Sequence, residues 1–173
     1  MRVAALLRGI NIGPHKRISM PELRTIVESL GHTDVETYLQ SGNVVFTPEG
    51  KADPAPRLAK AITERTGHEV AVLVRTAKEL AKVIEANPYP VSDPTKVVVV
   101  FTADELELGQ LGLGDLGPYL PDELTAHGRE LYVSVPNGQS QSKLMEALVK
   151  RRLPTTITVR NWRTVEALAE MTR

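Results

Sequence analysis

Apolar residues recur along this chain in two spacings, which predict alternating strands and helices. Short apolar or alternating runs predict strands at residues 3–8, 35–40, 44–47, 69–75, 96–102, 124–127, 130–135 and 156–159. Apolar residues three or four positions apart predict helices that begin near Ser19, Asp53, Thr76, Ser142 and Asn161. The segment from residue 104 to about 120 is interrupted by glycine, so it is expected to be at most partly helical.

The predicted elements follow the same order twice: strand, helix, strand, strand, helix, strand, helix. Short matches at nearly equal spacing support a duplication, among them Gly42 with Gly128 and Val74-Arg75 with Val159-Arg160. The sequence therefore predicts an α+β fold of duplicated ferredoxin-like (βαββαβ) subdomains, each followed by a helix. We expect the subdomains to span residues 1–88 and 95–173, and to be closely packed because the connection between them is short.

Composition narrows the possible classes of protein. The absence of Cys among 173 residues excludes a disulfide framework, thiol catalysis and Cys-ligated zinc. The longest wholly aliphatic or aromatic run, residues 97–101, is far shorter than the ~20 residues that span a membrane. We therefore expect a soluble, cytoplasmic protein that does not use a membrane. A net charge of zero argues against bulk coating of nucleic acid.

The charges are unevenly distributed along the chain. Residues 104–123 contain six acids and no Lys or Arg, whereas residues 143–163 contain six bases and one acid. The first 24 residues also contain five bases and one acid. If the two basic segments meet in the fold, they create a local positive site on a neutral protein.

The predicted topology gathers polar residues into two clusters. The loop after the first strand and the hairpin between the next two strands share one sheet edge, because the crossover is right-handed. The predicted ligand-binding residues of this first cluster are Arg8, Asn11, Lys16, Gln40, Ser41 and Asn43. Those of the second cluster, where the last two strands of the second subdomain end, are Ser142, Lys143, Arg160, Asn161 and Trp162.

These residue types suit an anion, although each also has a purely structural interpretation. Arg8 and Arg160 can clamp a phosphate or carboxylate, and a helix that begins beside Lys143 favours negative charge. Alternatively, the two arginines are strand-end charges in water, and Ser142 and Asn161 only cap helices. Trp162 can equally pack in the core, and the segment around Ser41 can be a plain turn. The clustering favours the functional interpretation.

Other chemistry has weaker support. The four His residues lack metal-ligand spacing, so we expect no metal site. No nucleophile elbow or phosphate-binding glycine loop of the known types occurs. With 4% aromatic residues, the chain offers little for base stacking on RNA.

Several motifs resemble one bacterial family, the domain-of-unknown-function 1697 family. They are Leu7-Arg8-Gly9-Ile10-Asn11-Ile12-Gly13, Tyr38-Leu39-Gln40-Ser41-Gly42-Asn43-Val44-Val45-Phe46, Ser142-Lys143-Leu144 and Arg160-Asn161-Trp162. Pro14 stands where the family usually has a second glycine. The resemblance implies two related ferredoxin-like subdomains and implies no activity. Its signature residues coincide with the two polar clusters.

The leading hypothesis is a basic pocket for a small anionic ligand, a phosphorylated metabolite or nucleotide. The alternatives are a nucleic-acid-binding protein that uses the same basic surface, and a protein-interaction module without a ligand. An enzyme of this kind would use electrostatic stabilisation with little covalent participation. No motif specifies a reaction, a cofactor or an oligomeric state.

Overall fold

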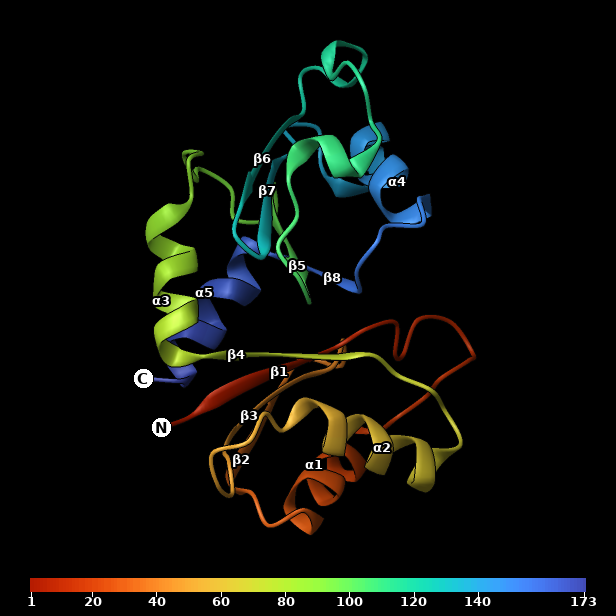
Figure 1. Ribbon diagram of the computed structural model, residues 1–173, viewed down its shortest axis with the longest axis vertical. Helices are drawn as coiled ribbons and strands as arrows, with labels where there is room; N and C mark the ends of the chain where they lie inside the picture. Colours follow the sequence, from red (N-terminus) through yellow and green to blue (C-terminus); the bar gives the residue numbers. More distant parts are fainter. The chain divides into compact units, whose positions relative to one another are not determined.

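The computed structural model describes residues 1–173 as a mixed α+β protein with two four-stranded antiparallel sheets and five α-helices (Figure 1). The first half contains β1 (Val3–Leu7), α1 (Met20–Ser29), β2 (Thr33–Tyr38), β3 (Asn43–Thr47), α2 (Ala55–Thr66), β4 (Val72–Thr76) and α3 (Ala77–Ala86). The second half contains β5 (Val97–Thr102), β6 (Glu123–His127), β7 (Glu130–Ser134), α4 (Lys143–Lys150), β8 (Ile157–Asn161) and α5 (Trp162–Met171). The α+β prediction is confirmed, and the two sheets suggest two similar subdomains.

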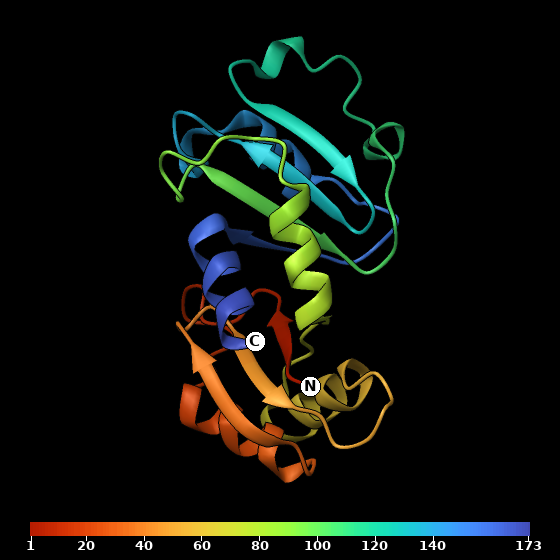
Figure 2. The ribbon, with the colours of Figure 1, turned by 90° about the vertical axis from the view of Figure 1, so that its left-hand side faces the viewer.

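In the first sheet the central position of β1 follows from its composition. The strand order is β2-β3-β1-β4, and all five residues of β1 are buried. Val3, Ala5 and Leu7 alternate toward a core that also contains residues of α1 and α2. The two helices lie on the same face of this sheet (Figures 1 and 2). Ser19 caps α1, since its hydroxyl accepts a hydrogen bond from the backbone of Glu22.

The second sheet has the equivalent order, β6-β7-β5-β8, with the apolar strand β5 in the interior. Val98 and Val100 of β5 pack in a core with Leu144 and Leu148 of α4. The connection between β5 and β6 differs from the β1–β2 connection because it contains no α-helix. It forms two 3-10 helices, η1 (Leu108–Leu111) and η2 (Gly117–Tyr119), as the glycine-rich sequence predicts. None of the protein's helices is long and apolar enough to cross a membrane.

The chain divides into two compact units, Met1–Lys82 with Ala167–Arg173, and Val83–Glu166. The C-terminal residues join the first unit through Arg2, whose guanidinium donates to the carbonyl of Met171 at 2.7 Å. The same guanidinium donates to the carbonyl of Asp34 at 2.6 Å and pairs with the Glu36 carboxylate at 3.3 Å. A single arginine thus links the end of α5 to the β2 region.

Several predicted strands differ from the structure at their ends, and two of them show the cause. The strand expected at residues 35–40 is β2 at 33–38, because Leu39 adopts a positive φ of 56° and turns the chain. The strand expected at 69–75 is β4 at 72–76. Val70 is buried although it lies before β4. Its apolar side chain therefore fits the alternating pattern of a strand without belonging to one.

His32, which lies directly before β2, is a buried titratable group of the first unit. Its ring stacks on Phe46 with the centroids 4.6 Å apart, and its Nδ1 accepts a hydrogen bond from the Glu49 backbone. The buried Nε2 has no hydrogen-bond partner. Burial, reinforced by the nearby Arg57 guanidinium and opposed by the Glu49 carboxylate, lowers the pKa of His32 below its ordinary value.

We predict that this histidine makes stability depend on pH. Folding lowers the pKa of His32, whereas the unfolded chain takes up a proton near the ordinary pKa of 6.5. As the pH falls through about 6.5, the unfolded state therefore binds more protons than the folded state, and the free energy of unfolding decreases from there toward the lowered pKa of the folded state. Urea denaturation at several pH values measures this slope. The His32→Asn variant should flatten it; equal slopes in the variant and the natural protein would contradict the assignment.

Candidate functional site

The β1–α1 loop begins at a point fixed by both neighbours of β1. The Leu7 backbone donates to the carbonyl of Gly42 at 2.8 Å, and the Arg8 backbone donates to the carbonyl of Ala71 at 3.0 Å. The loop therefore leaves the sheet at the same end as the β2–β3 turn. The Arg8 side chain is exposed at this end, with no hydrogen-bond or ion-pair partner.

Asn11 holds the loop to the turn. Its Nδ2 donates to the carbonyls of Ile18 and Gln40, each at 2.8 Å, and its Oδ1 accepts from the Ile18 backbone at 2.8 Å. The Asn11 backbone adopts a φ of 56°, a conformation that asparagine tolerates better than most residues. This side chain closes the loop over residues 11–18 and has little hydrogen-bonding capacity left for a ligand.

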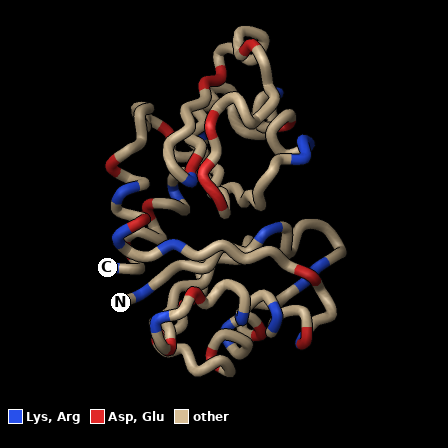
Figure 3. Tube along the Cα trace, viewed as in Figure 1, with Lys and Arg blue, Asp and Glu red and all other residues tan.

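The closed loop presents several basic side chains. His15, Lys16 and Arg17 are exposed in addition to Arg8. Lys16 Nζ donates to the carbonyl of Glu69 at 2.9 Å, and Arg17 donates to the carbonyls of Asn11 and Gly13 at 3.3 and 3.4 Å. Lys and Arg residues mark this loop in Figure 3. Sequence reasoning left Arg17 out of the site, although the run of three bases between Pro14 and Ile18 is a usable signal.

The β2–β3 turn contributes the remaining residues of the first cluster. Gln40 and Ser41 are exposed, whereas Asn43 is fully buried and its Nδ2 donates to the Tyr38 carbonyl at 2.9 Å and to Ser41 Oγ at 3.0 Å. Gly42 has a φ of 93°, and a Cβ there would lie 2.8 Å from the Leu7 Cβ. The Asn43 hydrogen bonds therefore fix the shape of the turn. Glycine is needed at position 42 because a side chain there would collide with Leu7 of β1.

Two aliphatic side chains are exposed on the same loop and turn. Ile12 is 75% exposed and Leu39 is 57% exposed. The hydrogen bond from Asn11 to Gln40 joins the two segments next to these residues. The sequence analysis assigned no role to either residue.

In the second cluster the polar residues at α4 mainly serve the fold. Ser142 Oγ accepts from the Met145 backbone at 3.0 Å and donates to the buried Asp122 carboxylate at 2.7 Å. Lys143 is exposed, but Glu146 lies in the first turn of the same helix. A cavity of about 550 Å³ beside this helix start is lined by Gln139, Ser140, Ser142, Met145, Glu146 and Val149. The carboxylates of Glu146, in the lining, and of Asp122, bonded to Ser142, make this position unfavourable for an anion.

The end of β8 contains the remaining predicted residues. Arg160 is buried, and its guanidinium donates to Thr158 Oγ1 at 2.9 Å and to the Val159 carbonyl at 2.8 Å. Burial lowers its pKa to about 10, so it stays protonated at neutral pH. Asn161 caps α5 by accepting from the Thr164 backbone at 3.0 Å, and Trp162 is buried.

The first cluster is thus assembled by hydrogen bonds between loop and turn, whereas the second consists mainly of helix caps and buried groups. The clusters belong to different units. No group of three or more His, Asp or Glu side chains is placed to hold a metal ion.

We predict that Asn11 stabilises the loop through its amide group. The Asn11→Asp variant keeps an acceptor for the Ile18 backbone but loses both donated hydrogen bonds, so it should lower the free energy of unfolding by about 1–3 kcal/mol. Asn11→Gly, which suits the positive φ, isolates the loss of the side chain. Urea denaturation of both variants measures the effect; an Asp variant as stable as the natural protein would show that these hydrogen bonds contribute little.

Comparisons with other proteins agree with this fold. A family model described as "Protein of unknown function (DUF1697)" matches residues 1–132. The structure of the conserved bacterial protein SP0830 from Streptococcus pneumoniae superposes with a TM-score of 0.77 at 21% sequence identity, covering 99% of this chain and 98% of the other. No curated protein matches the sequence.

Proposed function

This chain belongs to the DUF1697 family, and we propose that it binds a small anionic ligand, a phosphorylated metabolite or nucleotide, at the β1–α1 loop. The observation that carries the proposal is the exposed, unpartnered Arg8 guanidinium at the start of a loop that also presents Lys16 and Arg17. A guanidinium can bind two oxygens of a phosphate at once, which gives both affinity and orientation.

The surroundings of Arg8 support an anion. Residues 8–21 contain no acid, so no carboxylate within the loop neutralises its bases. Gly9 and Gly13 have open space where a Cβ would lie, which lets a ligand approach the backbone. Asn11 holds the loop in place before any ligand arrives, and a preformed loop reduces the entropy lost on binding.

The proposal assigns the predicted residues to two roles. Arg8, Lys16, Gln40 and Ser41 are proposed ligand contacts, because their side chains are exposed around the loop and turn. The proposed scaffold residues, whose side chains hydrogen-bond within the chain, are Asn11, Asn43, Ser142 and Asn161. Contributions of Lys143, Arg160 and Trp162 to a ligand site stay predictions, as does a cytoplasmic location.

Docking of a protein partner on the same loops is a second candidate function, favoured by the exposed Ile12 and Leu39. Aliphatic side chains at loop tips contribute little to phosphate binding but can contribute to a protein interface. Replacing Ile12 by Ser would weaken such an interface and leave phosphate binding unchanged.

We also propose that both units are versions of the ferredoxin-like βαββαβ arrangement, derived from an internal duplication. The matching strand orders support this, as do two buried arginines at the ends of β4 and β8, each donating to the preceding carbonyl. Arg75 is followed by Thr76, which caps α3, and Arg160 by Asn161, which caps α5. The domain limits 1–88 and 95–173 stay a prediction.

The ligand proposal is tested by thermal denaturation with inorganic phosphate, a sugar phosphate, ADP and a short oligonucleotide. A ligand at about 100 times its Kd stabilises the folded state by about 2.7 kcal/mol. This should raise the Tm by about 5–10 °C at this chain length. The Arg8→Ala, Lys16→Ala double variant should lose most of the shift.

The control is Arg65→Ala, which removes an exposed arginine from the last turn of α2 and should keep the shift. A shift that survives in the double variant would place the anion elsewhere. The absence of a shift with every anion would overturn the proposal, and a shift with the oligonucleotide alone would favour nucleic-acid binding.

A further inference from the structure

The outer edge of β6 is a free strand edge in the second sheet. A two-residue turn, Gly128-Arg129, joins β6 to β7, and the closing pair is His127 with Glu130. In such a hairpin the closing pair exchanges two hydrogen bonds and every second pair does the same. Leu124 and Ala126 are therefore at non-hydrogen-bonded positions, and their backbone N–H and C=O groups face away from β7.

The corresponding edge strand of the first sheet, β2, is protected, in contrast to β6. The pairing of β2 with β3 shifts register between Thr33 and Glu36, and Asp34 in between has a φ of 53°. Such an irregularity twists an edge and prevents another strand from pairing with it. The pairing of β6 with β7 runs through five consecutive residue pairs without a shift. Of these two corresponding edges, β2 and β6, the β6 edge is the one that can accept another strand.

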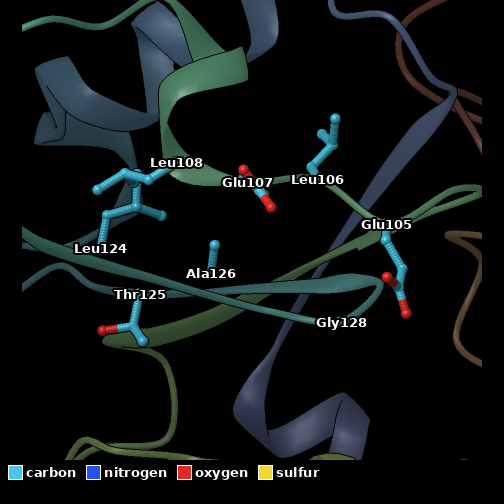
Figure 4. A pocket seen from close by; sticks show the side chains of 8 residues that line it. All are labelled: Glu105, Leu106, Glu107, Leu108, Leu124, Thr125, Ala126 and Gly128. Carbon is cyan, nitrogen blue, oxygen red and sulfur yellow. The ribbon is translucent and has the colours of Figure 1, made fainter.

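A cleft lies beside this edge and is lined by the same residues. It has a volume of about 520 Å³, and its lining includes Leu106, Leu108, Leu124 and Ala126 (Figure 4). The cleft exists because the β5–β6 connection has no α-helix, whereas α1 buries three apolar side chains in the equivalent connection. Leu108 remains 45% exposed at its rim. The cleft is large enough for an aliphatic side chain from outside.

The rim of the cleft is acidic. Glu105 and Glu107 contribute to its lining and are labelled in Figure 4. The Glu105 carboxylate has no ion-pair partner. The whole stretch 104–123 carries six acids without a Lys or Arg, and Figure 3 shows acidic residues along this connection. Basic groups are therefore favoured next to the cleft.

We propose that β6 binds an extended, basic segment of a partner protein as an additional strand of the second sheet. The backbone of the segment pairs with Leu124 and Ala126, and its aliphatic side chain enters the cleft. Its Lys or Arg side chains pair with Glu105 and Glu107. Main-chain pairing with a pocket for alternate side chains is a known mode of peptide recognition. A second copy of this chain fits less well, because paired β6 edges would bring two acidic rims together.

The test uses a fluorescent peptide of alternating lysine and valine as the probe, with a glutamate-valine peptide as its control. Fluorescence anisotropy should show saturable binding of the lysine peptide alone, weakened by added salt. Amide hydrogen exchange should show new protection at Leu124 and not in β2. This site lies in the second unit, so its result is independent of the anion proposal for the first.

The decisive variant is Ala126→Pro, which removes the outward-facing N–H without removing a hydrogen bond to β7. It should lower the affinity for the lysine peptide about tenfold or more. The matched control Ala126→Ser keeps the N–H and should bind within about twofold of the natural protein. Glu105→Gln with Glu107→Gln should also weaken binding and reduce its dependence on salt, and this pair decides the matter if the proline variant does not fold.

Three outcomes would overturn the proposal. They are absence of saturable binding of the lysine peptide, equal binding of the glutamate peptide, and full affinity in a folded Ala126→Pro variant. Sedimentation of the chain alone provides a further check. Self-association that Ala126→Pro abolishes would assign the β6 edge to a second copy instead of a basic partner.

Discussion

The first unit depends on the pairing of β1 with a strand on each side. β3 and β4 both run antiparallel to β1, and the pairing continues into the following chain through Leu7 with Gly42 and Arg8 with Ala71. These bonds fix the first residues of the β1–α1 loop at the sheet end that also carries the β2–β3 turn. Asn11 then joins loop and turn directly. The position of the basic loop is therefore a consequence of backbone pairing.

The order of elements and the neighbourhood of the loops could be predicted, because apolar spacing and turn residues are local signals. These signals are incomplete where tertiary structure overrides them. Leu39 continues an apolar pattern, yet the turn holds it at a positive φ. The sequence places Lys143 beside Ser142 and suggests an anion site, but Asp122, 20 residues earlier, reaches the same hydroxyl. Contacts between distant segments, such as this hydrogen bond, leave no local trace in the sequence.

Hydrogen-bonding capacity separates the scaffold from the candidate ligand contacts. Asparagine and serine often bind ligands. In this protein, however, four such side chains hydrogen-bond to the backbone of a turn, loop or helix start: Asn11, Asn43, Ser142 and Asn161. Since the same amide or hydroxyl suits both roles, the sequence could not distinguish them. The exposed guanidinium of Arg8 differs because no group of the chain binds it. An unpaired cation at a rigid position is therefore the stronger indicator of a ligand.

The connection between the first two strands differs between the two units. Between β1 and β2 the chain forms a basic loop and then α1, whose apolar face covers the sheet. Between β5 and β6 it forms short 3-10 helices rich in acids, and these leave a cleft next to an unprotected strand. A covered sheet leaves only loop side chains for recognition, which suits a small anion. A partly covered sheet exposes backbone and apolar floor, which suits a peptide, and the acidic charge selects a basic one.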